Sequence, residues 1–166
     1  MDGPTPSDPP LTHFGRAQCE TLKHSFPAME RITHILCSPM TRTLQTALCA
    51  FEPVLRRGVA IEPWQLLREV GSGPASTVEE LRTKFDDAPI EWENLEEDWH
   101  EYRHPSGLTY CSPGPWSEIR KTLYEYGQFA LRNQPKEEEG NDIEILVVSH
   151  GGAIRRMVGG RESFAL

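Results

Sequence analysis

Short apolar runs alternate along this chain with longer stretches in which apolar residues recur at helical spacing. Residues 32–37, ITHILC, form a short run with β-branched side chains, which predicts a buried strand. A second run, from Ile143 to Val148, predicts another strand. Residues 59–67 also suit an extended conformation, although Pro63 interrupts them.

A helix is expected directly behind the first run. Ser38 is a residue type that caps helices well, and Pro39 suits the first helical position because its missing N–H would be unpaired there anyway. The apolar stripe behind this start consists of Met40, Leu44, Ala47, Leu48 and Phe51. Residues 32–51 therefore predict a strand, a tight turn and a helix.

Other segments carry the apolar spacing of amphipathic helices. Thr12 is suited to cap the first of them, which Pro27 closes. The second, residues 76–85, opens with a Ser-x-x-Glu capping box that begins at Ser76. A last helix is expected to begin near Ala153, directly behind the second strand. The longest stripe lies between them and consists of Trp116, Ile119, Leu123, Tyr126 and Ala130.

Strands that alternate with helices predict an α/β fold with a parallel or mostly parallel sheet. The length of 166 residues fits a single domain over residues 1–166. Residues 1–10 are rich in proline and are expected to be irregular. Residues 86–105 are acidic, contain tryptophan and show no clear period, so we interpret them as an insertion or lid.

The composition is acidic, with a net charge of −8, which argues against nucleic acid or an anionic membrane as a partner. No apolar run approaches the roughly 20 residues of a membrane helix, and the N-terminus lacks a signal-peptide pattern. The 4 cysteines form no Cys-x-x-Cys pair, so we expect reduced thiols and a cytoplasmic location. On such a protein an anion must bind in a local basic pocket.

Polar residues gather where the two predicted strands run into helices, at residues 38–47 and 149–156. The first turn of a helix offers unpaired N–H groups and the positive end of the helix dipole, which together favour an anion. Arg42 lies in the first of these turns and can present a planar fork of donors. His150 precedes the second turn and is followed by two glycines, which let the backbone approach a ligand. The combination predicts a phosphate pocket.

Four segments in this order resemble the histidine phosphatase superfamily, the phosphoglycerate mutase-like proteins. The DPPLT opening and the tryptophan-containing middle are most similar to the fungal phosphatase-like branch of that family. The resemblance implies a three-layer α/β/α sandwich with a mostly parallel sheet. The segments are LTHFGRAQ (11–18), SPMTRTLQTA (38–47), LLREVGS (66–72) and SHGG (149–152).

The resemblance also implies a chemistry, in which a phosphoryl group passes to a histidine nucleophile and then to water or another acceptor. By this resemblance Arg42 binds the phosphate, His150 is the second histidine of the site and Gly151 contributes a backbone donor. Glu69 takes the place of the acid that protonates the leaving group. The partner implied is a small phosphorylated metabolite, and no metal or cofactor is implied.

The nucleophile of this family lies in an Arg-His-Gly motif at the end of the first strand, and this sequence contains no such motif. We therefore expect a fold without the first strand and without the C-terminal part, and an enzyme that is impaired or inactive as written. His13 stands nearest to the missing motif in sequence, but it lies at a helix start. Truncation, degradation of the gene and a rearranged sheet are the explanations left open.

Two other functions compete with this interpretation. Residues 100–104, HEYRH, match the His-Glu-x-x-His pattern of zinc hydrolases. Pro105 disfavours the helix that would bring both histidines to one face, so this match is weak. The more serious alternative is a non-catalytic protein with the same fold, which binds an anion or a partner through Arg42 and His150.

Overall fold

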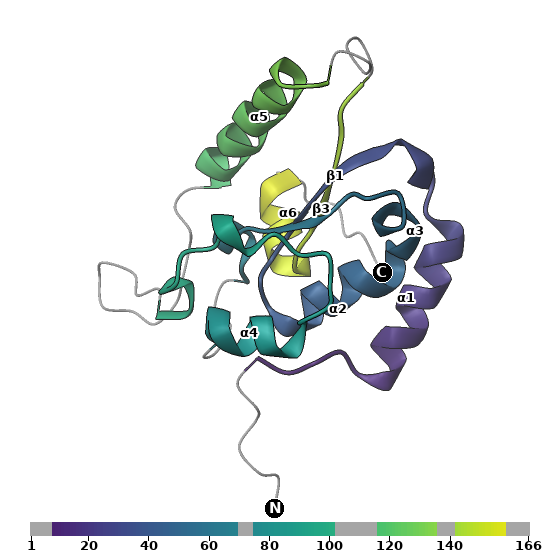
Figure 1. Cartoon of the computed structure of the whole chain (residues 1–166), viewed down its shortest axis with the longest axis vertical. Coiled ribbons are helices and arrows are strands. Elements are labelled where there is room, and N and C mark those ends of the chain that lie inside the picture. Colours follow the sequence, from purple (N-terminus) through teal and green to yellow (C-terminus); the bar gives the residue numbers. More distant parts are fainter. Residues whose placement is uncertain (1–7, 70–74, 102–115, 136–141, 159–166) are drawn as a thin grey trace, which may run out of the picture.

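The core of the structure is a parallel sheet (Figure 1). The computed structural model describes residues 8–69, 75–101, 116–135 and 142–158. Within them the strand order is β2-β1-β3, with β1 at Ile32–Cys37, β2 at Ile61–Pro63 and β3 at Glu144–Val148. Both apolar runs are therefore confirmed as strands, whereas only the middle of residues 59–67 is extended.

The strands end at the same level of the sheet. Cys37, the last residue of β1, is in register with Pro63 of β2 and with Val148 of β3. The pairing continues one residue further, because the Ser38 N–H donates to the Val148 carbonyl over 2.9 Å. The chain segments that leave β1, β2 and β3 therefore emerge side by side at one edge, where ligands bind in open parallel sheets.

Helices cover both faces of the sheet, which confirms the three-layer α/β/α arrangement. Ile35 and Cys37 of β1 point into one core, and Leu36 between them points into the other. Leu36 has no solvent exposure, and burying such a side chain contributes about 1.5–3 kcal/mol. The first core packs against α1 (His13–Ser25), α2 (Thr41–Ala50), α3 (Glu52–Leu55) and α4 (Val78–Lys84), and the second against α5 (Trp116–Arg132) and α6 (Gly151–Val158).

The predicted start of α2 is wrong. The helix begins at Thr41 rather than behind Ser38 and Pro39, and its N-cap Met40 makes no side-chain capping bond. The Asp8 carboxylate caps it instead, since Asp8 Oδ1 accepts from the Thr41 N–H over 2.8 Å and Oδ2 accepts from Thr41 Oγ1 over 2.6 Å. Ser38 does not cap the helix, and its hydroxyl contacts His150 instead.

The other helix starts agree more closely with the sequence. Thr12 caps α1, as expected, by accepting from the Gly15 N–H over 3.0 Å. The capping box of α4 is formed by Thr77 and Glu80, so the prediction that it begins at Ser76 is wrong by one residue. Helix α6 begins at Gly151, slightly before Ala153. The remaining turns are the 3₁₀ helices η1 (Met29–Arg31), η2 (Gln65–Leu67), η3 (Trp92–Asn94) and η4 (Trp99–Glu101).

The described part of the acidic segment 86–105 packs against the main core. Ile90 forms a bridge with Ile61 of β2, and Leu95 and Trp99 are buried in the same core as α2. Its role as an insertion or lid stays a prediction. Among the described helices, none has the length and apolarity that crossing a membrane requires.

The capping box of α4 gives a direct test of the local structure. Thr77→Ala removes the acceptor for the Glu80 N–H and should lower the free energy of unfolding by about 1 kcal/mol. Ser76→Ala is the matched control and should leave that free energy within about 0.5 kcal/mol of wild type. Urea denaturation measures both values. A larger loss for Ser76→Ala than for Thr77→Ala would show that the helix begins elsewhere.

Candidate functional site

The ends of β1 and β3 bring Ser38 and His150 into contact. Ser38 follows β1 directly, and His150 lies between β3 and α6. The Ser38 hydroxyl lies 2.9 Å from His150 Nε2, and both side chains are buried. The contact joins residues 112 positions apart in sequence, which only the parallel pairing of the two strands brings together.

Arg42 closes the other side of the imidazole. It is the second residue of α2, and its guanidinium Nη2 lies 3.2 Å from His150 Nδ1. The same nitrogen donates to Glu69 Oε2 over 2.9 Å, and that oxygen lies 3.5 Å from His150 Nδ1. Arg42, Glu69 and His150 therefore meet at one point. The roles assigned to them stay predictions.

Glu69 is placed by the segment that follows β2. The Ser149 hydroxyl donates to the Leu67 carbonyl over 2.7 Å, which ties the end of this segment to the end of β3. The side chain of Glu69 is 36% exposed and that of Arg42 is 24% exposed, whereas His150 lies beneath them. An incoming solute would therefore meet the Arg42–Glu69 ion pair first.

Arg68 is a buried cation beside the site that the sequence analysis missed. Only 4% of it is exposed, its guanidinium lies 5.4 Å from the ring centre of Trp99, and it donates to the Trp99 carbonyl over 3.2 Å. Its charge acts on His150. The available signal was its position directly before the predicted acid, Glu69, in a segment that is otherwise apolar.

His150 is held in its neutral form. Burial is the main cause that lowers the pKa of His150, to about 3, and the charges of Arg42 and Arg68 lower it further, while Asp8 raises it. Because a guanidinium can only donate, His150 Nδ1 must accept from Arg42 and the proton must lie on Nε2. The Nε2–H group then donates to the Ser38 hydroxyl.

The glycines after His150 leave open space at the start of α6. A Cβ atom on Gly151 would meet nothing within 4 Å, and one on Gly152 would lie 3.7 Å from Glu69 Oε1. The first N–H groups of a helix lack intrahelical partners and lie at the positive end of its dipole. The start of α6 is therefore an accessible donor surface next to the carboxylate of Glu69.

The start of α2 is already occupied by a carboxylate of the chain itself. Asp8 is 4% exposed and binds Thr41, whose hydroxyl also accepts from Lys84 Nζ over 2.9 Å. The expectation that both helix starts offer donors to a ligand therefore applies to α6, while at α2 the Thr41 N–H binds Asp8. The sequence alone offered little sign of this contact, because Asp8 is one acidic residue in a segment that was expected to be irregular.

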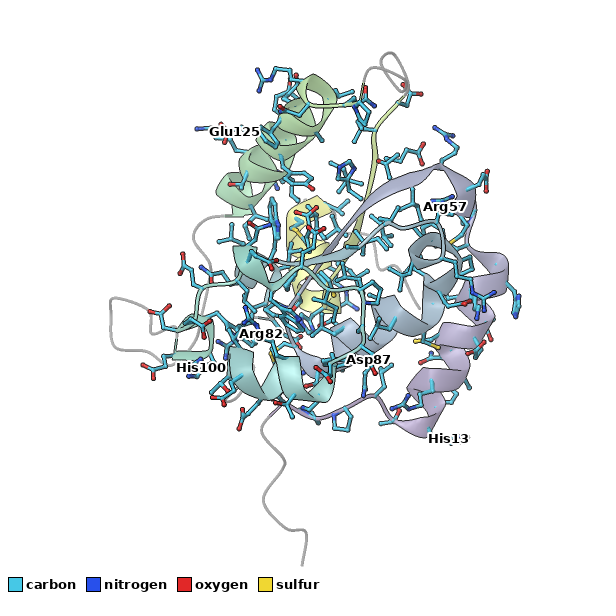
Figure 2. The ribbon with its side chains drawn as sticks, viewed as in Figure 1. His13, Arg57, Arg82, Asp87, His100 and Glu125 are labelled. Atoms are coloured by element: carbon cyan, nitrogen blue, oxygen red, sulfur yellow. The ribbon has the colours of Figure 1, made fainter. Side chains whose placement is uncertain are left out.

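Two other histidines belong to elements outside this cluster. His13 is exposed and is the first residue of α1 (Figure 2). His34 of β1 packs its ring edge-to-face on Tyr126 of α5. Of the zinc-like pattern, His100 and Glu101 belong to η4, and residues 102–104 lie outside the described residues. The part of the chain that the structure describes contains no group of three or more potential metal ligands.

Comparisons with known proteins bear on the family and the fold. A family model described as the histidine phosphatase superfamily (branch 1) matches residues 5–162. No curated protein matches the sequence. Among solved structures, the chain is similar to the ecdysone phosphate phosphatase from Bombix mori in complex with tungstate, with a TM-score of 0.55 and 20% sequence identity. The match covers 96% of this chain and 61% of that one, so the chain spans about three fifths of that phosphatase's length.

The neutral state of His150 predicts a pH effect on stability. The imidazole takes up a proton near pH 6.5 in the unfolded chain but only near pH 3 in the folded one, so protons favour unfolding between these values. Compared with a His150→Gln variant, the wild type should lose about 1 kcal/mol of unfolding free energy per pH unit below pH 6.5. Chemical denaturation of both proteins at several pH values measures this difference. Parallel pH profiles would contradict a buried neutral imidazole.

Proposed function

Since this chain belongs to the histidine phosphatase superfamily, we propose that it binds the phosphate group of a small phosphorylated metabolite between Arg42 and His150. The observation that carries the proposal is the contact of one guanidinium with both His150 and Glu69. A guanidinium suits a phosphate because its planar donors match two phosphate oxygens at once. The start of α6 adds backbone donors on the same side.

Phosphate binding would exchange partners within the site. The Glu69 carboxylate now accepts from Arg42, and a phosphate would compete with it for the same guanidinium. The negative charge of the phosphate would also favour protonation of His150, whose pKa is otherwise lowered by burial. As an imidazolium, His150 could donate to a phosphate oxygen instead of accepting from Arg42.

Glu69 is proposed as the proton donor for the leaving group. In phosphoryl transfer through a histidine, a ring nitrogen forms a bond to phosphorus while the bond from phosphorus to the ester oxygen breaks, and that oxygen takes up a proton. Glu69 is partly exposed and lies next to the open space at Gly152, so a leaving group could reach it. A carboxyl group in this position acts as a general acid.

The sequence contains no Arg-His-Gly motif, which supplies the nucleophile in the resemblance described above. We therefore propose that the chain has the fold of a phosphomonoesterase and that its catalytic turnover is impaired or absent. The alternative is a non-catalytic protein that binds an anion or a partner through the same residues. Assignment to the fungal branch and a cytoplasmic location are further proposals, which rest on the sequence alone.

Calorimetry with inorganic phosphate tests the binding site. Arg42→Gln removes the charged donor and should lower phosphate affinity about tenfold or more, which corresponds to the roughly 1.5–3 kcal/mol of a charged hydrogen bond. Arg82→Gln is the control, because Arg82 is an exposed arginine on α4 (Figure 2). Equal affinities of wild type and Arg42→Gln would exclude this pocket for the enzyme and for the anion-binding protein alike.

An activity assay separates those two functions. With para-nitrophenyl phosphate, a general phosphomonoester, the chain as written should release no phosphate above the uncatalysed rate. The variant His150→Ala serves as the reference without the central imidazole. Measurable turnover that disappears in His150→Ala would contradict the proposed impairment and would show that this polypeptide is an active hydrolase.

A further inference from the structure

A second pocket is lined by residues of α5, of β2 and of the segments on either side of β2. Helix α5 lies on the side of the sheet opposite α1 and α3 (Figure 1). Its volume is about 530 Å³. None of Ser38, Arg42, Glu69 and His150 lines it, so it is separate from the phosphate site. Its lining consists of Glu62, Trp64, Gln65, Leu66, Glu91, Asn94, Thr122, Tyr126 and Phe129.

Aromatic rings form part of the wall. Trp64 and Tyr126 have ring centres 5.2 Å apart and planes at 88°, so the two rings form a corner. Phe129 lies one helical turn beyond Tyr126 on α5, lines the same pocket and is 61% exposed, which is unusual for a large apolar side chain. Rings at right angles with a third ring nearby are an arrangement that surrounds a cation with the negative faces of aromatic systems.

The two charged residues of the lining are both acidic. Glu62 on β2 is half-buried and accepts from the Tyr126 hydroxyl, and Glu91 lies close enough for its charge to act on Glu62. Burial is the main cause that raises the pKa of Glu62, and Glu91 raises it further, against the lowering effects of the Tyr126 hydrogen bond and of His34. None of the described lining residues is basic. The carboxylates therefore face an aromatic pocket without a cation among its lining residues.

We propose that this pocket binds an organic cation, an alkylated ammonium group, with Glu62 and Glu91 balancing its charge and Trp64, Tyr126 and Phe129 contacting its methyl or methylene groups. A bare metal ion fits less well, because the described residues include no cluster of three or more potential metal ligands. The methyl groups of an alkylated ammonium spread its charge over an apolar surface, which suits aromatic faces better than it suits water. This inference does not depend on the proposed phosphatase function.

Choline and its neutral isostere 3,3-dimethyl-1-butanol test the proposal on the full chain. The two molecules have nearly the same shape and differ in charge. We expect choline to bind in the millimolar range, observed by calorimetry or by NMR shifts of Trp64 and Tyr126, and the alcohol to bind at least about tenfold more weakly. Equal binding of both molecules, or no binding of choline at 50 mM (a limit of roughly 2 kcal/mol in affinity), would overturn the proposal.

Variants locate the binding within the pocket. Glu62→Gln keeps the shape of the side chain and should weaken choline binding on the order of fivefold. Glu91→Gln and Phe129→Ala alter exposed side chains, so they test the same site if Glu62→Gln does not fold, and each should weaken binding about threefold. Glu125→Gln, on the exposed face of α5 (Figure 2), is the control and should bind as wild type does.

Choline binding should not depend on the phosphate site. Arg42→Gln, which should lose phosphate, should keep its choline affinity. Unchanged choline affinity in Glu91→Gln and Phe129→Ala would overturn the pocket assignment, and so would a loss of affinity in Glu125→Gln as large as theirs.

Discussion

The contact of His150 with Ser38 on one side and Arg42 on the other is the interaction on which the site depends. Both ring nitrogens are engaged, Nε2 with a hydroxyl and Nδ1 with a guanidinium. An imidazolium would turn Nδ1 into a donor facing another donor, so this arrangement holds only while His150 is neutral. A bound anion would instead favour the protonated form of His150. In the proposed phosphate site, anion binding and protonation of His150 would therefore be coupled.

The charges around the proposed phosphate site would oppose the entry of an anion. The protein carries a net charge of −8, and two of its own carboxylates already contact the basic elements of the site. Asp8 binds the start of α2, and Glu69 binds Arg42. Asp8 is buried and its contacts are structural, whereas the partly exposed Glu69 can yield its place on Arg42. In the proposed site, competition from the carboxylate of Glu69 would therefore lower the affinity of Arg42 for a phosphate.

The fold class and the proximity of Arg42 and His150 could be predicted from the sequence, because both depend on regular structure. The runs that became β1 and β3 are short and apolar, and the carboxyl ends of parallel strands meet at one edge, so Arg42 and His150 could be placed together. The remainder depends on contacts between distant segments. Asp8 reaches Thr41 across 33 positions, and no local pattern marks that pairing. At α4, Ser76 and Thr77 are both good caps with a glutamate three residues later, so the local sequence does not decide between them.

The pocket beside α5 shows the same limit. Glu62, Trp64 and Tyr126 come from segments that a sequence pattern assigns to core packing, and only the tertiary structure gathers them around one cavity. Two parts of one small sheet thus present groups of opposite charge. The edge at the strand ends offers a guanidinium and the start of a helix, and the face beneath α5 offers carboxylates and aromatic rings.

Whether Arg42 and the start of α6 bind an anion can be tested by a crystal structure with bound tungstate. The heavy atom gives an anomalous signal that marks the anion's position. We expect one tungstate in contact with the Arg42 guanidinium and the start of α6, with Glu69 moved away from Arg42. A tungstate bound elsewhere, or a site that keeps the Arg42–Glu69 pair intact at saturating tungstate, would contradict it.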